Sequence, residues 1–209
     1  IVFSDDQAEA FDRVQALLLK AGVNAADGIL DAPDGVGGGV LAVTGKAGSG
    51  KTMLLSQLVK ELTEAGLEIV SGDYEGKKRR ERRTLAVLAP TNKAASVLRT
   101  RGVPATTIHR ILYTPIYAPE YEKLADWLAG TGERPVMEEL TEQALERAKA
   151  FFENVKSIPG ALAAAGLRGS DFIQGWKRRE EPLDIGFIDE SSMLDERQFE
   201  DLKEIFPTL

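Results

Sequence analysis

The 209-residue sequence has no cysteine, a single histidine, and no apolar run as long as the roughly 18 residues that a membrane-spanning helix needs. The lack of cysteine excludes disulfide frameworks and thiolate metal sites, and one histidine excludes a zinc site built from several histidines. Because no secretory signal opens the chain, the sequence predicts a cytoplasmic protein. What is present is ordinary globular composition, with 43% hydrophobic and 28% charged residues.

Acidic residues outnumber basic ones, and the formal net charge is −7. The charge is unevenly distributed, since six of the seven residues in Lys77–Arg83 are basic, whereas residues 119–153 hold nine acidic and four basic residues. The basic block is expected to be either a phosphate-binding arm or a solvated loop. Because local charge governs the attraction of a ligand, the acidic total does not exclude a nucleic-acid partner.

Short apolar runs alternate with helical patterns along the chain. The runs typical of buried strands are residues 40–43, 67–70, 85–88 and 185–188. Helical patterns begin near residues 5, 52, 93, 107 and 195. Strands that alternate with helices predict an α/β fold with a mainly parallel sheet flanked by helices. The length fits one such domain with an insertion.

Residues 114–183 differ in character from the rest of the chain, because helix formers dominate and prolines divide the segment. We expect a largely helical insertion here, between the first part of the domain (1–113) and its continuation (184–209). The large aromatic residues of this segment are expected in its core, with base stacking as the alternative. They are Trp127, Phe151, Phe152 and Trp176.

A phosphate-loop pattern, G-x-x-x-x-G-K-[ST], is matched at every fixed position between an apolar run and a helical pattern. The predicted nucleotide-binding residues are Gly45, Lys46, Ala47, Gly48, Ser49, Gly50, Lys51 and Thr52. The glycines let successive N–H groups surround an anion at a helix N-terminus, and an accidental glycine-rich turn is the alternative. Lys51 is expected to act in catalysis at the β- and γ-phosphates, and Thr52 to ligate Mg²⁺. The predicted cofactors are ATP and Mg²⁺.

Two adjacent carboxylates, Asp189 and Glu190, follow the apolar run 185–188. Ligands of open α/β sheets bind at the carboxyl ends of strands, so this position favours a site over the alternative, a solvated helix cap. Asp189 is expected to hold Mg²⁺, and Glu190 to orient or deprotonate the attacking water. Hydrolysis is favoured over kinase chemistry, which needs a site for a hydroxyl acceptor.

Four segments in family order resemble superfamily 1B DNA helicases of the RecD/Dda type. Their sequences are S-D-D-Q (4–7, like the Q motif), A-P-T-N-K-A-A (89–95, like motif Ia), T-T-I-H-R-I-L (106–112, like the segment after it) and D-E-S-S-M-L-D (189–195, like motif II). The resemblance covers residues 4–112 and 184–206. It implies a RecA-like P-loop NTPase domain, termed 1A, of an ATP-dependent DNA helicase that moves 5′→3′ on single strands and unwinds duplexes.

The resemblance also implies roles for individual residues. Gln7 would read the adenine edge with its amide, although Ser4 and Gln7 also fit a helix capping box, and both roles are compatible. The implied nucleic-acid contacts are Pro90, Thr91, Asn92, Lys93, Thr106, Thr107 and His109. For the threonines and their neighbours, helix capping is the alternative. His109 is expected to be structural or to contact DNA, and not to catalyse.

Several family elements do not follow the closing helix: motif III, a second RecA-like domain and an arginine finger. The chain is therefore expected to be domain 1A with its insertion, to bind ATP–Mg²⁺ weakly and to hydrolyse it poorly. The insertion 114–183 lies where the family places a strand-separating pin. Expected partners are single-stranded DNA, duplex junctions and the second RecA-like domain.

Two other functions are compatible with the same residues. One is a stand-alone P-loop ATPase or nucleotide kinase. The other is a non-enzymatic, nucleotide-gated nucleic-acid-binding module.

Overall fold

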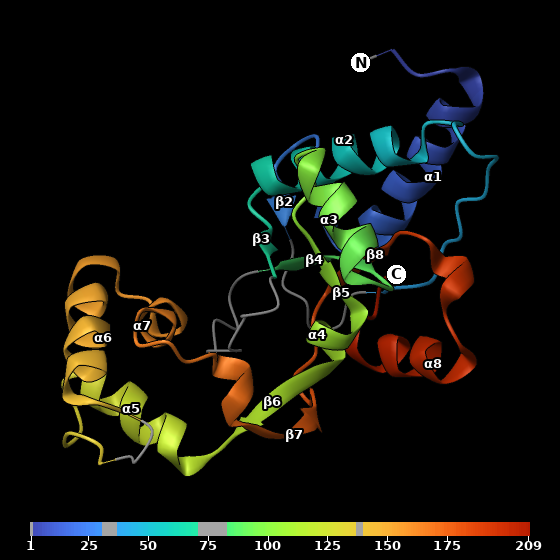
Figure 1. Cartoon of the computed structure of the whole chain (residues 1–209). Coiled ribbons are helices and arrows are strands. Elements are labelled where there is room, and N and C mark those ends of the chain that lie inside the picture. Colours follow the sequence, from blue (N-terminus) through green and yellow to red (C-terminus); the bar gives the residue numbers. More distant parts are fainter. Residues whose placement is uncertain (1, 31–36, 71–82, 137–139) are drawn as a thin grey trace. The chain divides into compact units, whose positions relative to one another are not determined.

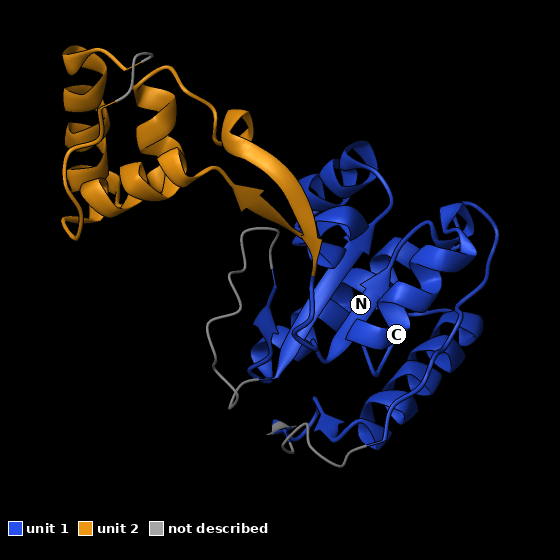
Figure 2. Cartoon of the chain, turned by 90° about the horizontal axis from the view of Figure 1, so that it is seen from below, with its two compact units in different colours: residues 1–113, 179–209 blue, residues 114–178 orange. Residues whose placement is uncertain are grey.

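A computed structural model describes residues 2–30, 37–70, 83–136 and 140–209. The chain divides into two compact units, which Figure 2 colours separately. Unit 1 consists of Ile1–Tyr113 and Arg179–Leu209, and unit 2 of Thr114–Arg178. No helix within the described ranges is long and apolar enough to cross a membrane.

Unit 1 is built on a parallel sheet with β4 (Thr84–Ala89) at its centre. Every residue of β4 is buried. One edge of β4 pairs with β3 (Glu68–Ile69) near its start and with β5 (Ala105–Thr107) near its end. The other edge pairs with β8 (Ile185–Ile188) over the whole length of that strand. All three pairings are parallel, so the predicted mainly parallel sheet is confirmed.

Alternating side chains of β4 contribute to two separate cores, one on each face of the sheet. Figure 1 shows the helices that cover the sheet. Leu85 and Val87 pack with helices α1, α2 and α3, whereas Ala86 and Leu88 pack with α4 and α8. These helices are α1 (Asp5–Lys20), α2 (Lys51–Glu64), α3 (Asn92–Thr100), α4 (Ile108–Leu112) and α8 (Glu196–Ile205). A short antiparallel pair, β1 (Val23–Asn24) with β2 (Ile29–Leu30), follows α1, and the 3₁₀ turn η2 (Ser191–Met193) precedes α8.

The predicted buried strand at residues 40–43 is wrong. Residues 40–43 do not form a strand, and Val40 and Val43 are 53% and 38% exposed. The segment instead makes main-chain hydrogen bonds with the last residues of the chain, from Leu41 N–H to the Leu209 carbonyl and from Leu209 N–H to the Gly39 carbonyl. A run of apolar residues shows strand tendency, but whether both faces become covered depends on distant segments.

Unit 2 combines a helical cluster with a two-stranded ribbon. Its elements are β6 (Tyr113–Tyr117), α5 (Pro119–Ala129), α6 (Glu142–Val155), α7 (Ile158–Ala164), η1 (Gly169–Phe172) and β7 (Ile173–Arg178). The helices have a hydrophobic core of their own, with Leu124, Leu145 and Leu162 among its buried members. The helical insertion was predicted, but the ribbon and the end of the unit at Arg178 rather than 183 were not.

The predicted aromatic residues of unit 2 lie at different depths. Trp127 and Phe152 are partly buried against the core of the unit, in agreement with a packing role. Phe151 and Trp176 are 37% and 47% exposed. Phe151 covers Gly160, where its ring occupies the space that a β-carbon would need.

Arg83, the last residue of the predicted basic block, forms a buried ion pair with Asp184. Residues 77–82 lie outside the described ranges, but Arg83 is buried, with its Nε 3.3 Å from Asp184 Oδ1. Arg83 also donates from Nη2 to the Ala21 carbonyl over 2.8 Å. Asp184 Oδ2 accepts a 2.8 Å hydrogen bond from Thr84 N–H. Arg83 therefore joins β4 to β8 and is unavailable for a phosphate-binding arm.

Candidate nucleotide site

The loop between residue 44 and helix α2 has the backbone geometry of an anion cradle. Gly48 and Gly50 adopt positive φ values of 79° and 84°, which glycine reaches without strain, and Gly50 is the N-cap of α2. A β-carbon at Gly45 would lie 2.7 Å from Ser49 Oγ, so a larger residue there would require the Ser49 side chain to move. Its carboxyl end is the N-terminus of a 14-residue helix, which favours negative charge.

Lys51, the first residue of α2, folds back over this loop. Its Nζ donates to the carbonyl oxygens of Gly45 and Lys46 over 2.6 and 2.9 Å, and to Ser49 Oγ over 3.4 Å. An ammonium group has three protons, so these acceptors satisfy all of them. The lysine is thereby held at the mouth of the loop, where a phosphate can replace the carbonyl oxygens as its partner.

Gln7 connects helix α1 to the same loop. Its Nε2 donates to the Ser49 carbonyl over 2.9 Å, while its Oε1 accepts from Ser4 N–H over 3.0 Å. Ser4 Oγ accepts from Gln7 N–H in return, which completes the predicted capping box. The amide still has one donor and one acceptor position available, so capping does not prevent contact with a base.

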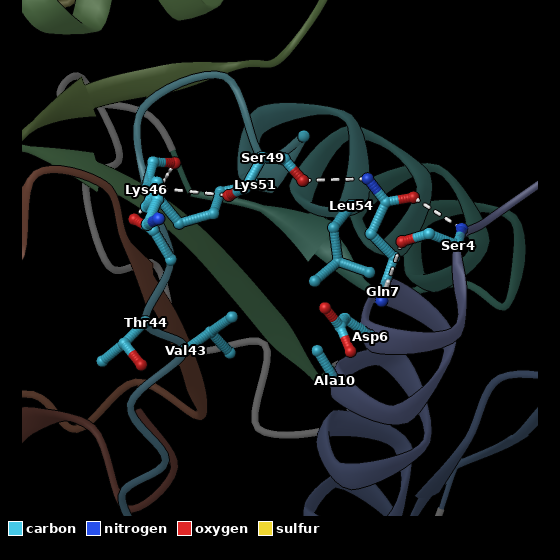
Figure 3. A pocket seen from close by; sticks show the side chains of 12 residues that line it. Ser4, Asp6, Gln7, Ala10, Val43, Thr44, Lys46, Ser49, Lys51 and Leu54 are labelled. Atoms are coloured by element: carbon cyan, nitrogen blue, oxygen red, sulfur yellow. Dashed lines mark hydrogen bonds between the residues drawn. The ribbon is translucent and has the colours of Figure 1, made fainter.

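A cavity of ≈ 550 Å³ lies between α1, the phosphate loop and α2 (Figure 3). In this view Lys46 and Lys51 are on one side of it, and Ser4, Asp6, Gln7 and Ala10 of the α1 region are on the other. Its remaining lining residues are Val43, Thr44, Gly45, Ser49, Gly50 and Leu54. Asp6 and Leu54 were not predicted as residues of the site, although Asp6 is next to Gln7 and Leu54 lies one turn after Lys51.

Asp189 and Glu190 follow β8 at the carboxyl edge of the sheet. Asp189 is half-buried, and its N–H continues the sheet ladder by donating to the Leu88 carbonyl over 2.9 Å. Glu190 is exposed and has a left-handed backbone, with φ 55° and ψ 42°. Neither side chain lines the cavity described above. Gly39 and Ile185 both form parallel β-bridges with Thr208, so the segment that precedes the phosphate loop runs parallel to β8. The phosphate loop and the two carboxylates therefore lie at the same carboxyl edge of the sheet.

The residues that follow β4 and β5 lie at the same edge, since Ala89 and Thr107 are paired across the two strands. Pro90 is half-buried, and Thr91, Asn92 and Lys93 are exposed, with Thr91 Oγ1 capping α3 through Ala94 N–H. After β5, His109 and Arg110 are exposed. The edge therefore presents amide, ammonium, imidazole and guanidinium groups beyond the ends of two neighbouring strands.

Thr106 and Thr107 are each only 7% exposed. Thr107 Oγ1 accepts a 3.3 Å hydrogen bond from Arg110 N–H, so this hydroxyl caps α4. The ring of His109 is 4.9 Å from that of Tyr113, centroid to centroid. The geometry matches the capping alternative for Thr107 and a packed but accessible place for His109.

Comparison with protein families matches residues 34–208 to a family model described as an AAA domain. The match includes the phosphate loop, strands β4 and β5, and the carboxylates after β8. The chain belongs to this AAA family. It is thus a P-loop NTPase domain with a RecA-like α/β fold, and this family of domains occurs in superfamily 1 helicases. Searches of curated proteins and of solved structures gave no match.

The residues at this edge suit a nucleotide with Mg²⁺. The glycine loop offers N–H groups and a helix N-terminus to phosphates, and Lys51 offers a cation. Thr52, the second residue of α2, and Asp189 offer the hard oxygen ligands that Mg²⁺ prefers. The described residues contain no group of three or more His, Cys, Asp or Glu side chains arranged for a metal, so a bound Mg²⁺ would need phosphate and water oxygens as well.

The two roles of Gln7 can be separated by a pair of variants. Ser4→Ala should cost about 1 kcal/mol of stability through loss of the cap, and should leave the affinity for ATP nearly unchanged. Gln7→Ala should destabilise α1 similarly and also weaken ATP binding about tenfold, because the loop and the base lose the amide. Urea unfolding and calorimetric titration measure the two effects. Equal ATP affinity in both variants would restrict Gln7 to capping.

Proposed function

We propose that the chain is the ATP-binding motor domain of an ATP-dependent DNA helicase of the superfamily 1B type. In this proposal it couples ATP hydrolysis to 5′→3′ movement along a single strand and to duplex unwinding. The observation that supports it is the shared carboxyl edge of the parallel sheet. The phosphate loop and Asp189 lie at this edge together with the exposed Thr91–Lys93 segment, so nucleotide and nucleic acid would be bound by neighbouring strands.

At the nucleotide, each residue of the chain has a role that its chemistry allows. The loop N–H groups and Lys51 would hold the phosphates, and Lys51 would exchange its carbonyl partners for phosphate oxygens. Thr52 and Asp189 would hold Mg²⁺, which when bound neutralises charge on the β- and γ-phosphates. Glu190, exposed one residue beyond Asp189, would accept a proton from the attacking water.

At the nucleic acid, the exposed side chains after β4 and β5 would contact phosphates. Asn92 and Lys93 begin α3, whose N-terminus adds partial positive charge, and His109 and Arg110 lie on α4. Since β4 and β8 are hydrogen-bonded neighbours from Leu85–Ile185 to Leu88–Ile188, a shift of one strand end on hydrolysis would move the other. Thr106 and Thr107 are buried, so they would not touch the nucleic acid themselves. They would instead hold α4, which carries His109 and Arg110, in place.

ATP turnover, measured with and without a single-stranded oligonucleotide, tests the proposal. A motor domain should convert ATP to ADP and phosphate, and this turnover should depend on Glu190. Transfer of the phosphoryl group to a hydroxyl acceptor would instead identify a kinase. ATP binding without any turnover in a single-turnover assay would identify a nucleotide-gated binding module.

A further inference from the structure

The cavity wall carries two lysines, and only one of them has its ammonium group engaged. Lys51 Nζ is held by three acceptors of the loop. Lys46 is exposed, lines the same cavity, and makes no side-chain hydrogen bond or ion pair with any residue that the structure describes. The phosphate-loop pattern leaves this position free to be any residue, so the pattern itself does not require a lysine there.

The contacts of Lys51 indicate that the β- and γ-phosphates lie beside residues 45 and 46. In P-loop NTPases the lysine at the start of the helix binds β- and γ-phosphate oxygens. Here its Nζ lies 2.9 Å from the carbonyl oxygen of Lys46 and 2.6 Å from that of Gly45. A β- or γ-phosphate oxygen that replaces these partners would therefore lie next to the main chain of residues 45 and 46.

The charged residues that line the cavity also favour an anion beside Lys46. Asp6 is the one acidic residue among the cavity lining, and Figure 3 shows it beside Ala10 and Gln7, on the side opposite Lys46. Lys46 thus faces the phosphate end without an acidic partner to neutralise it. Its ammonium can approach a ligand without breaking an existing bond, and this lowers the cost of binding.

We propose that the side chain of Lys46 is a second phosphate-binding cation, which contacts the γ-phosphate and makes the site prefer nucleoside triphosphates to diphosphates. This role deepens the proposed ATPase activity and rests on it. The γ-phosphate is present in ATP and absent in ADP, so the loss of Lys46 should weaken the two complexes unequally. A charge that acts only through the general field of the protein would weaken both.

The test measures ATP and ADP affinities of the 209-residue chain by isothermal titration calorimetry with Mg²⁺ at about 0.1 M salt, where general electrostatic effects are screened beyond about 10 Å. Lys46→Met keeps the apolar stem and removes the charge. We expect it to weaken ATP binding about tenfold and ADP binding less than twofold, and Lys46→Arg to restore most of the difference. Lys60→Met removes the same charge from an exposed position on α2 and should change neither affinity.

The outcomes separate this inference from the function on which it rests. If the unaltered chain binds ATP and Lys46→Met changes ATP and ADP affinity equally, or changes neither, Lys46 does not contact the γ-phosphate. If the unaltered chain binds no ATP at all, both the proposed ATPase function and the proposed role of Lys46 fail. A circular dichroism melt of each variant confirms that the chain is folded in every titration.

Discussion

Replacement of Glu190 by glutamine is expected to lower ATP turnover by at least about 100-fold while ATP affinity changes less than threefold. General bases contribute about 10²–10⁴-fold to rate, and glutamine keeps the size of the side chain but cannot accept a proton at neutral pH. The backbone at this position is left-handed, which costs a residue with a β-carbon about 1 kcal/mol. Glutamine has the same cost, so the substitution changes charge and basicity alone.

Single-turnover hydrolysis of radiolabelled ATP measures this effect, since it detects slow chemistry. Glu196→Gln is the matched control, because Glu196 is an exposed carboxylate at the start of α8 and should leave turnover unchanged. Unchanged hydrolysis in Glu190→Gln would remove this residue from catalysis and leave the attacking water without its proposed base.

Replacement of Asp184 by alanine should lower the free energy of unfolding by about 3–5 kcal/mol. The change leaves the guanidinium of Arg83 buried without its carboxylate, 3.3 Å from the lost oxygen, and removes the acceptor of Thr84 N–H. The cost of keeping the buried guanidinium without this carboxylate, rather than the lost attraction, accounts for most of the effect.

Urea unfolding followed by circular dichroism gives the size of this loss. Asp184→Asn keeps an oxygen for Thr84 and should cost less than alanine, about 2 kcal/mol. A loss below about 1 kcal/mol in the alanine variant would show that the Arg83 side chain reaches water, and that the pair does not hold β4 and β8 together.

Features set by local chemistry were predictable from the sequence. Strands β4 and β8 are predictable because residues 85–88 and 185–188 hold no polar side chain, and α8 is predictable because Asp195 and Gln198 fit a capping box at its start. The phosphate loop was recognised because its glycines must occupy fixed positions for the backbone to turn. In each case the signal lies within about ten residues of the chain.

Features that depend on distant partners were not predictable. Residues 40–43 pair with the end of the chain rather than between two strands, and no local pattern reveals this. Arg83 belongs to a basic block in the sequence, but Asp184, distant in the sequence, fixes its position. The ribbon strand β6 was missed because Pro115 interrupts its strand pattern, although every second N–H of a two-stranded ribbon faces away from its partner and tolerates proline.

Affinity for single-stranded DNA with and without ATP–Mg²⁺ tests the central claim most directly. Fluorescence anisotropy of a labelled oligonucleotide, with the Glu190→Gln variant holding ATP unhydrolysed, measures the coupling between the two ligands. We expect ATP to change DNA affinity at least about fivefold, and expect no change in Glu190→Gln combined with Lys51→Ala. No binding of single-stranded DNA, or the same affinity with and without ATP, would contradict the proposal that this domain drives a helicase.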